Sequence, residues 1–143
     1  MSVAPPSKLD AEGVQAILDR SPFISSLALK VIGLDHAKGE VVMRMPLKPE
    51  FERRLGTNQF HGGPIAAFID IVGDYAIGML VGGGVPTINL RIDYLRPAVG
   101  QAIVGTGRVR RQGRTVALVD IEIADEEGKL VAVGRGTYAP QLG

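Results

Sequence analysis

The chain has 143 residues, of which 45% are hydrophobic and 22% charged, and its formal net charge is +1. These values predict one soluble domain spanning residues 1–143, with no overall field that would attract nucleic acid or a membrane surface. The absence of cysteine excludes disulfides, a thiol nucleophile and thiolate metal sites. The polar start and the lack of a long uncharged apolar run predict no signal peptide, no membrane span and a cytoplasmic location.

The first third of the chain predicts one short helix and two strands. Residues 1–21 read as a leader followed by an amphipathic helix over Leu9–Arg20, which Ser21-Pro22 ends. Strands are expected over Leu27–Leu34 and Gly39–Leu47, joined by a hairpin turn. The polar, irregular residues 48–60 predict a surface loop.

The middle of the chain predicts a long helix over Pro64–Val81 that is apolar nearly all round, which is typical of a buried helix. Four further strands are predicted over Pro86–Leu95, Gln101–Arg111, Thr115–Ala124 and Leu130–Ala139. This order predicts an α+β fold in which an antiparallel β-sheet wraps around one long central helix.

Asp70 is the sharpest candidate for chemistry, because it lies in the apolar run of the long helix. An ionised carboxylate there needs a partner or an open cavity. Asp70 either serves a functional site, or it only faces a water-filled groove or pairs with an arginine. Asp74, one turn later on the same face, is a weaker candidate, since it can simply mark where the helix returns to solvent.

The segment His61-Gly62-Gly63 stands at the start of this helix. Free N–H groups there point towards an anion, and glycine allows close approach of a ligand carbonyl, so the segment could hold an oxyanion. The alternative is a tight turn with His61 as a cap. Nine residues of helix separate His61 from Asp70 by more than about 10 Å. If both act on one substrate, one of them must come from another subunit.

The stretch HGGPIAAFID resembles the signature of the phenylacetate-degradation (PaaI-like) type of hotdog-fold acyl-CoA thioesterases. The stretches PTINLRIDYLRPA and GRTVALVDIEIADEEGKLVAVGRGTY are similar to the later strands of that family. The resemblance covers residues 22–138. It implies a hotdog fold, hydrolysis of acyl-CoA thioesters, no cofactor and no metal, and a homodimer that pairs further into a homotetramer.

The resemblance also implies roles for single residues. Asp70 would be the nucleophile or general base, and the N–H of Gly62 would hold the oxyanion with support from His61. Thr87 occupies the place of an assisting hydroxyl. Relatives often carry Asn six residues before the histidine, where this chain has Leu55, so Asn58 is the nearest amide that could substitute.

Several residues are candidates for binding the acyl-CoA substrate. Gly63 allows close approach, and arginine suits the phosphates of coenzyme A. Arg96 and Arg114 are the preferred candidates, while Arg53 and Arg54 in the loop before the helix are weaker ones. Charge that protects a solvated strand edge is the common alternative.

Three other readings of the sequence stay open beside the thioesterase. One is a hotdog module that binds acyl-CoA without catalysis, and another is a hotdog dehydratase or hydratase. The second needs a histidine beside an acid, and the only other histidine, His36, lies in a predicted turn. A purely structural oligomer is disfavoured by a carboxylate in the apolar helix.

Overall fold

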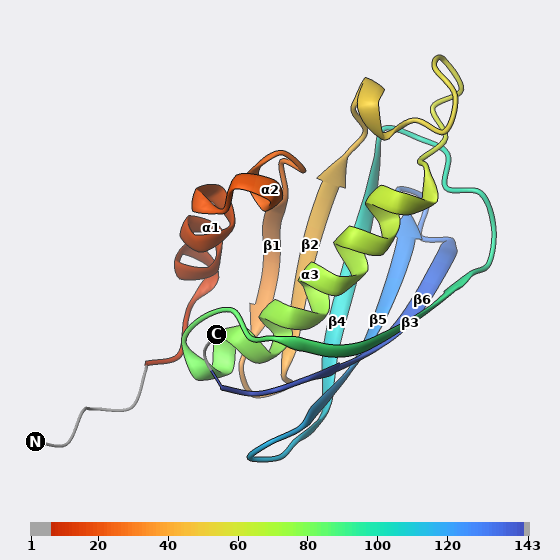
Figure 1. Cartoon of the computed structure of the whole chain (residues 1–143). Helices are drawn as coiled ribbons and strands as arrows, with labels where there is room; N and C mark the ends of the chain where they lie inside the picture. Colours follow the sequence, from red (N-terminus) through yellow and green to blue (C-terminus); the bar gives the residue numbers. More distant parts are fainter. Residues whose placement is uncertain (1–6, 142–143) are drawn as a thin grey trace, which may run out of the picture.

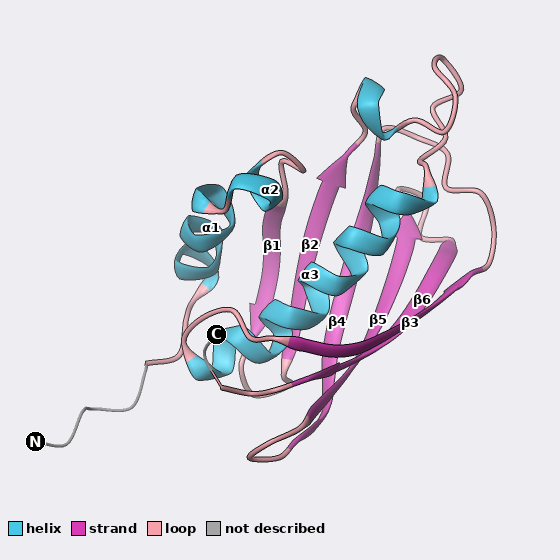
Figure 2. Cartoon of the chain, viewed as in Figure 1, coloured by secondary structure: helices cyan, strands magenta, loops and turns pink. Residues whose placement is uncertain are grey.

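The computed structural model describes residues 7–141, so most of the predicted leader lies outside the described residues. Its elements are three α-helices, one 3-10 turn and one antiparallel sheet of six strands (Figures 1 and 2). The helices are α1 (Ala11–Arg20), α2 (Pro22–Ser25), η1 (Pro49–Phe51) and α3 (Gly62–Val81). The strands are β1 (Lys30–Asp35), β2 (Glu40–Pro46), β3 (Thr87–Tyr94), β4 (Ala102–Gln112), β5 (Ala117–Asp125) and β6 (Leu130–Tyr138).

The strand order is β1-β2-β4-β5-β6-β3, so β1 and β3 form the two edges of the sheet. After β2 the chain crosses the sheet through α3 and forms β3 at the far edge. Among the described residues, β3 pairs only with β6, which comes later in the chain. Figure 1 shows α3 lying diagonally across one face of the curved sheet, with α1 and α2 beside β1. The predicted architecture, a sheet wrapped around one central helix, is confirmed.

Helix α3 lies close to the sheet because glycines face it from the strands. A Cβ atom at Gly105 would lie 3.0 Å from the Phe68 ring, and one at Gly134 would lie 2.5 Å from Ile69. Phe68 and Ile69 have no exposed surface. The missing Cβ atoms let these large side chains enter the sheet surface, and the dense packing fixes the rotation of α3 about its axis. That rotation decides where its carboxylates point.

The predicted elements agree with the observed ones to within a few residues, with one local exception. The strand expected from Leu27 starts only at Lys30, because the short helix α2 and a turn with Ala28 at φ 55° occupy the preceding residues. Helix α3 starts two residues earlier than predicted, at Gly62, with His61 as its N-cap. The oxyanion candidate is therefore the first residue of the helix.

By length and hydropathy alone, α3 would qualify as a membrane span, although its sequence carries two aspartates. In this fold it is the core helix, with 61% of its most apolar window buried inside the protein. The apolar character predicted from the sequence therefore reflects burial against the sheet.

Candidate active site

The first turn of α3 is held in place by two side chains. The Gly63 N–H donates to Nδ1 of His61 over 2.9 Å, which makes His61 the N-cap of the helix. The Tyr94 hydroxyl, at the end of β3, donates to the Gly62 carbonyl over 2.8 Å. The Gly62 N–H belongs to the first turn and has no acceptor within the helix. Both hydrogen bonds hold the Gly62–Gly63 peptide group, which directly follows this free donor.

His61 has a defined role in this turn. Because its Nδ1 accepts a hydrogen bond, a neutral imidazole carries its proton on Nε2. The same bond occupies the N–H of Gly63, so Gly63 offers a ligand close approach but no free backbone donor. The sequence does not link Tyr94 to the Gly62 carbonyl, because no local pattern connects two residues that are 32 positions apart.

Asp70 lies on the third turn of α3 and is half-buried. The Thr87 hydroxyl, from the first residue of β3, donates to its Oδ1 over 2.8 Å. Among residues 7–141 no salt bridge includes Asp70, so the arginine partner considered as an alternative is absent from that part of the chain. The carboxylate is held by a neutral donor, and Oδ2 is left for other contacts.

Tyr138 is a second support of Asp70 that sequence reasoning missed. Its side chain is fully buried, and its hydroxyl lies 3.1 Å from the Asp70 carbonyl and 3.4 Å from Oδ1. Burial raises the pKa of this phenol far above its usual value, with Asp70 and Asp74 adding to the effect, so it stays a proton donor. A Cβ atom at Gly73 would lie 2.1 Å from the hydroxyl, so this glycine makes room for the phenol.

The second acid, Asp74, has a different environment. Its Oδ1 accepts the Val85 N–H over 2.8 Å, in the segment that leads into β3. Burial raises its pKa from 3.8 to about 7; the Val85 hydrogen bond opposes this rise, and the negative charge of Asp70 adds to it. Desolvation is therefore the largest cause of the shift at Asp74, and the like charge of Asp70 is a smaller one.

The remaining candidates lie apart from Asp70. Asn58 is exposed in the loop before α3, with φ 56° and its carbonyl bound by the Gly100 N–H. Arg96 lines a groove of about 320 Å³ beside Gly62. Arg114 lies in the hairpin between β4 and β5, at the opposite end of the sheet from the start of α3 (Figure 1). Within one chain, Arg114 and Gly62 are therefore far apart.

Two further features do not belong to this site. A hollow of about 470 Å³ lies on the outer face of the sheet, where Arg91 pairs with Asp93 and Arg135 with Asp120. His36 contacts the Leu9 carbonyl through Nε2 over 2.7 Å, at the turn between β1 and β2. Over residues 7–141 no group of three or more histidine or acidic side chains could hold a metal ion.

The geometry gives two half-sites on one helix. Gly62 offers an N–H donor at the positive end of the helix, where a developing negative charge is stabilised. Asp70 offers a carboxylate eight residues later, about 12 Å further along the axis. This distance is too long for both groups to reach the same carbonyl carbon.

Comparison with known proteins places this arrangement in a family. The family model described as the Thioesterase superfamily matches residues 58–132, just over half of the chain, and includes both half-sites. The chain is 39% identical over 114 residues to a protein named as an esterase in Saccharolobus solfataricus, covering 78% of each chain. It is 32% identical over 112 residues to human acyl-coenzyme A thioesterase 13, covering 76% of this chain and 78% of that protein.

Solved structures agree with these sequence relatives. Zebrafish thioesterase superfamily member 2 is 28% identical and superposes with a TM-score of 0.78, covering 92% of this chain and 95% of that one. The Escherichia coli PaaI protein of the phenylacetic acid degradation operon is 25% identical, also with a TM-score of 0.78, covering 93% and 96%. The hotdog fold and the PaaI-like resemblance are thereby confirmed, and the chain belongs to the thioesterase superfamily.

Proposed function

We propose that this protein hydrolyses acyl-CoA thioesters to a free acid and coenzyme A, and that it does so in the cytoplasm. The observation that carries the proposal is the setting of Asp70, a carboxylate within an apolar helix whose side-chain partners are two hydroxyl donors. Such a carboxylate keeps one oxygen for chemistry. The acyl-CoA thioesterases among the relatives support the substrate class.

The chemistry follows from the two half-sites. Asp70 takes a proton from water as the water oxygen attacks the thioester carbonyl, or its own oxygen attacks first. The carbonyl oxygen becomes negative and accepts the Gly62 N–H. When the tetrahedral intermediate collapses, the C–S bond breaks and the thiolate takes the proton that Asp70 removed from water. If Asp70 attacks first, the thiolate takes a proton from solvent, and water then hydrolyses the acyl–Asp70 anhydride to the free acid and restores the carboxylate. In either role Thr87 and Tyr138 occupy Oδ1 and leave Oδ2 to react.

We also propose that each site combines Asp70 of one subunit with Gly62 of another. Strand β3 is an unpaired edge that exposes large apolar side chains, with Ile88 57% and Tyr94 53% exposed. Such an edge invites pairing with a second strand. Antiparallel pairing of two β3 edges brings two α3 helices together in opposite directions. A two-fold dimer then creates two equal sites, and pairs of dimers would form a tetramer.

The test is thiol release from a panel of short, long and aromatic acyl-CoAs, with wild type and Asp70→Asn measured side by side. We expect turnover by wild type on at least one class and a loss of at least a hundredfold in Asp70→Asn, on the order of 3 kcal/mol of transition-state stabilisation. Circular dichroism verifies that the variant is folded. Binding of acyl-CoA without turnover on any ester would instead favour the non-catalytic binding module.

A further inference from the structure

The loop between η1 and α3 carries a second hollow, next to the groove beside Gly62. Its lining residues, which we call the arginine cup, are Arg53, Arg54, Thr57 and Gln59, around a volume of about 280 Å³. The groove beside Gly62, which we call the entrance groove, has as its members Arg53, Gln59, Phe60, Gly62, Ile65, Tyr94, Leu95, Arg96, Pro97 and Ala98. Arg53 and Gln59 line both, so the two hollows are adjacent.

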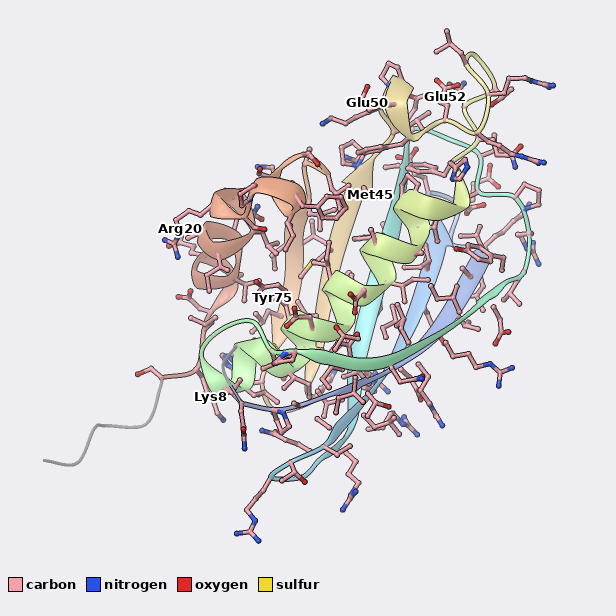
Figure 3. All side chains as sticks on the ribbon, in the orientation of Figure 1. Lys8, Arg20, Met45, Glu50, Glu52 and Tyr75 are labelled. Atoms are coloured by element: carbon pink, nitrogen blue, oxygen red, sulfur yellow. The ribbon has the colours of Figure 1, made fainter. Side chains whose placement is uncertain are left out.

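The loop that builds the arginine cup is held by its own backbone. The Arg53 N–H donates to the Gln59 carbonyl over 2.8 Å, and the His61 N–H donates to the Phe51 carbonyl over 2.7 Å. The Glu52 carboxylate accepts the N–H groups of Thr57 and Asn58. Figure 3 shows Glu52 at the end of the molecule where α3 begins. The cup is therefore a preformed feature joined directly to the N-cap of the helix.

The charges of the cup have no partner in the described part of the chain. Arg53, Arg54 and Arg96 form no salt bridge within residues 7–141. The nearby Glu52 is one negative charge against these three positive ones, and its oxygen is already bound to backbone N–H groups. The hollow on the outer face of the sheet differs, because its two lining arginines, Arg91 and Arg135, are paired with aspartates. Unpaired arginines around a hollow favour an anion with several oxygens.

We infer that the arginine cup binds the phosphate groups of the coenzyme A nucleotide, while the pantetheine arm runs along the entrance groove to Gly62. The inference rests on the proposed function and adds which part of the chain recognises the non-reacting half of the substrate. It assigns this role to Arg53 and Arg54, with Arg96 at the rim of the groove. Within one chain, Arg114 lies at the opposite end of the sheet from the cup and is not part of it.

The test compares two double variants that remove the same charge. Arg53→Gln with Arg54→Gln empties the cup. The matched control is Arg20→Gln with Arg111→Gln, two exposed arginines outside the cup that form no salt bridge within residues 7–141. Each is assayed with an acyl-CoA and with the same acyl group on N-acetylcysteamine, a thioester without phosphates. We expect the cup variant to raise KM for acyl-CoA at least tenfold, with kcat changed by less than about twofold.

The truncated thioester decides what such a loss means. The inference requires that kcat/KM for this substrate is the same in wild type and the cup variant, and that the control variant changes neither substrate. An equal loss on both substrates would mean that the loop only supports the structure, and the inference would fail. It would also fail if the control variant lost as much acyl-CoA activity as the cup variant.

A binding experiment separates this inference from the proposed function. Adenosine 3′,5′-bisphosphate, which carries nucleotide phosphates but no thioester, is titrated calorimetrically into wild type and both variants. Binding that is lost only in the cup variant supports the phosphate site, even if no thioester is hydrolysed. Hydrolysis of acyl-CoA with unchanged binding in the cup variant would overturn the inference and leave the proposed function intact.

Discussion

Asp70 and Asp74 lie one turn apart on the same helix, yet their surroundings prepare them for different tasks. Asp70 is held by hydroxyl groups of Thr87 and Tyr138, which leave one oxygen free. Asp74 accepts a backbone N–H from Val85, and burial raises its pKa to about 7. Spacing along the helix therefore does not decide which acid is functional. Under the proposed function, the donors that the neighbouring strands supply decide it.

The difference also assigns a structural role to Asp74. Its bond to Val85 fixes the segment that carries the chain from α3 into β3, two residues before Thr87. Asp74 thus helps to place the hydroxyl that holds Asp70. Its cost is a buried charge, which the fold carries to keep this segment in position.

The largest expected effect separates the two acids by activity. Asp70→Asn should lower kcat for an acyl-CoA by at least a hundredfold, whereas Asp74→Asn should lower it by less than about fivefold, since Asn keeps an acceptor for Val85. Both are isosteric, so steady-state rates at pH 8 compare them directly. Equal losses in the two variants would contradict the division of roles.

A second prediction concerns stability and pH. The pKa of Asp74 is about 7 in the folded chain and near 3.8 when unfolded, so the folded state binds more protons between these values. The contribution of Asp74 to the free energy of unfolding therefore falls as the pH rises from about 4 to 7, and it stays low above pH 7. Asp74→Asn removes that loss, and we expect it to gain on the order of 2 kcal/mol in free energy of unfolding at pH 8.

Urea unfolding at pH 4.5 and pH 8, at one fixed protomer concentration, measures this gain. Wild type should be less stable at pH 8 than the variant, and the two should converge at pH 4.5. If Asp74→Asn were less stable than wild type by the same amount at both pH values, the prediction would fail. The Asp74 carboxyl group would then be needed for more than its bond to Val85.

The smallest expected effect concerns the donors to Asp70. Thr87→Val keeps the side-chain shape and removes the 2.8 Å hydrogen bond, so we expect kcat to fall about tenfold. Tyr138→Phe removes the longer contact and should cost less, about threefold. Thr87→Ser, which keeps a hydroxyl, is the control and should retain most activity. A loss in Thr87→Ser as large as in Thr87→Val would point to packing instead of hydrogen bonding.

Much of this architecture could be predicted from the sequence, because the signals are local. The apolar run of α3, the break at Ser21-Pro22 and the polar loop over residues 48–60 indicated the order of the elements. Asp70 stood out since a carboxylate in such a run needs an explanation. Thr87 was found only through the family resemblance, as nothing in its own strand distinguishes it from an ordinary β-branched residue.

The rest depends on contacts between residues far apart in the chain. Tyr138 reaches Asp70 across 68 positions, and Tyr94 reaches Gly62 across 32. Their hydroxyls are placed by the strand order, which no local pattern encodes. The arginine cup likewise forms only when the loop folds back on itself, so in the sequence Arg53 and Arg54 were only weaker candidates for binding acyl-CoA.

If each site is built from two chains, mixing two inactive variants should restore activity. Asp70→Asn removes the carboxylate, and Gly62→Pro removes the N–H at a first helical position where proline is tolerated. The two are refolded together in equal amounts and assayed with an acyl-CoA. If the site is shared, each mixed dimer holds one intact site, and about a quarter of wild-type activity returns. If activity stays at the level of the separate variants although mixed dimers form, the two groups do not combine across subunits and the proposed shared site is wrong.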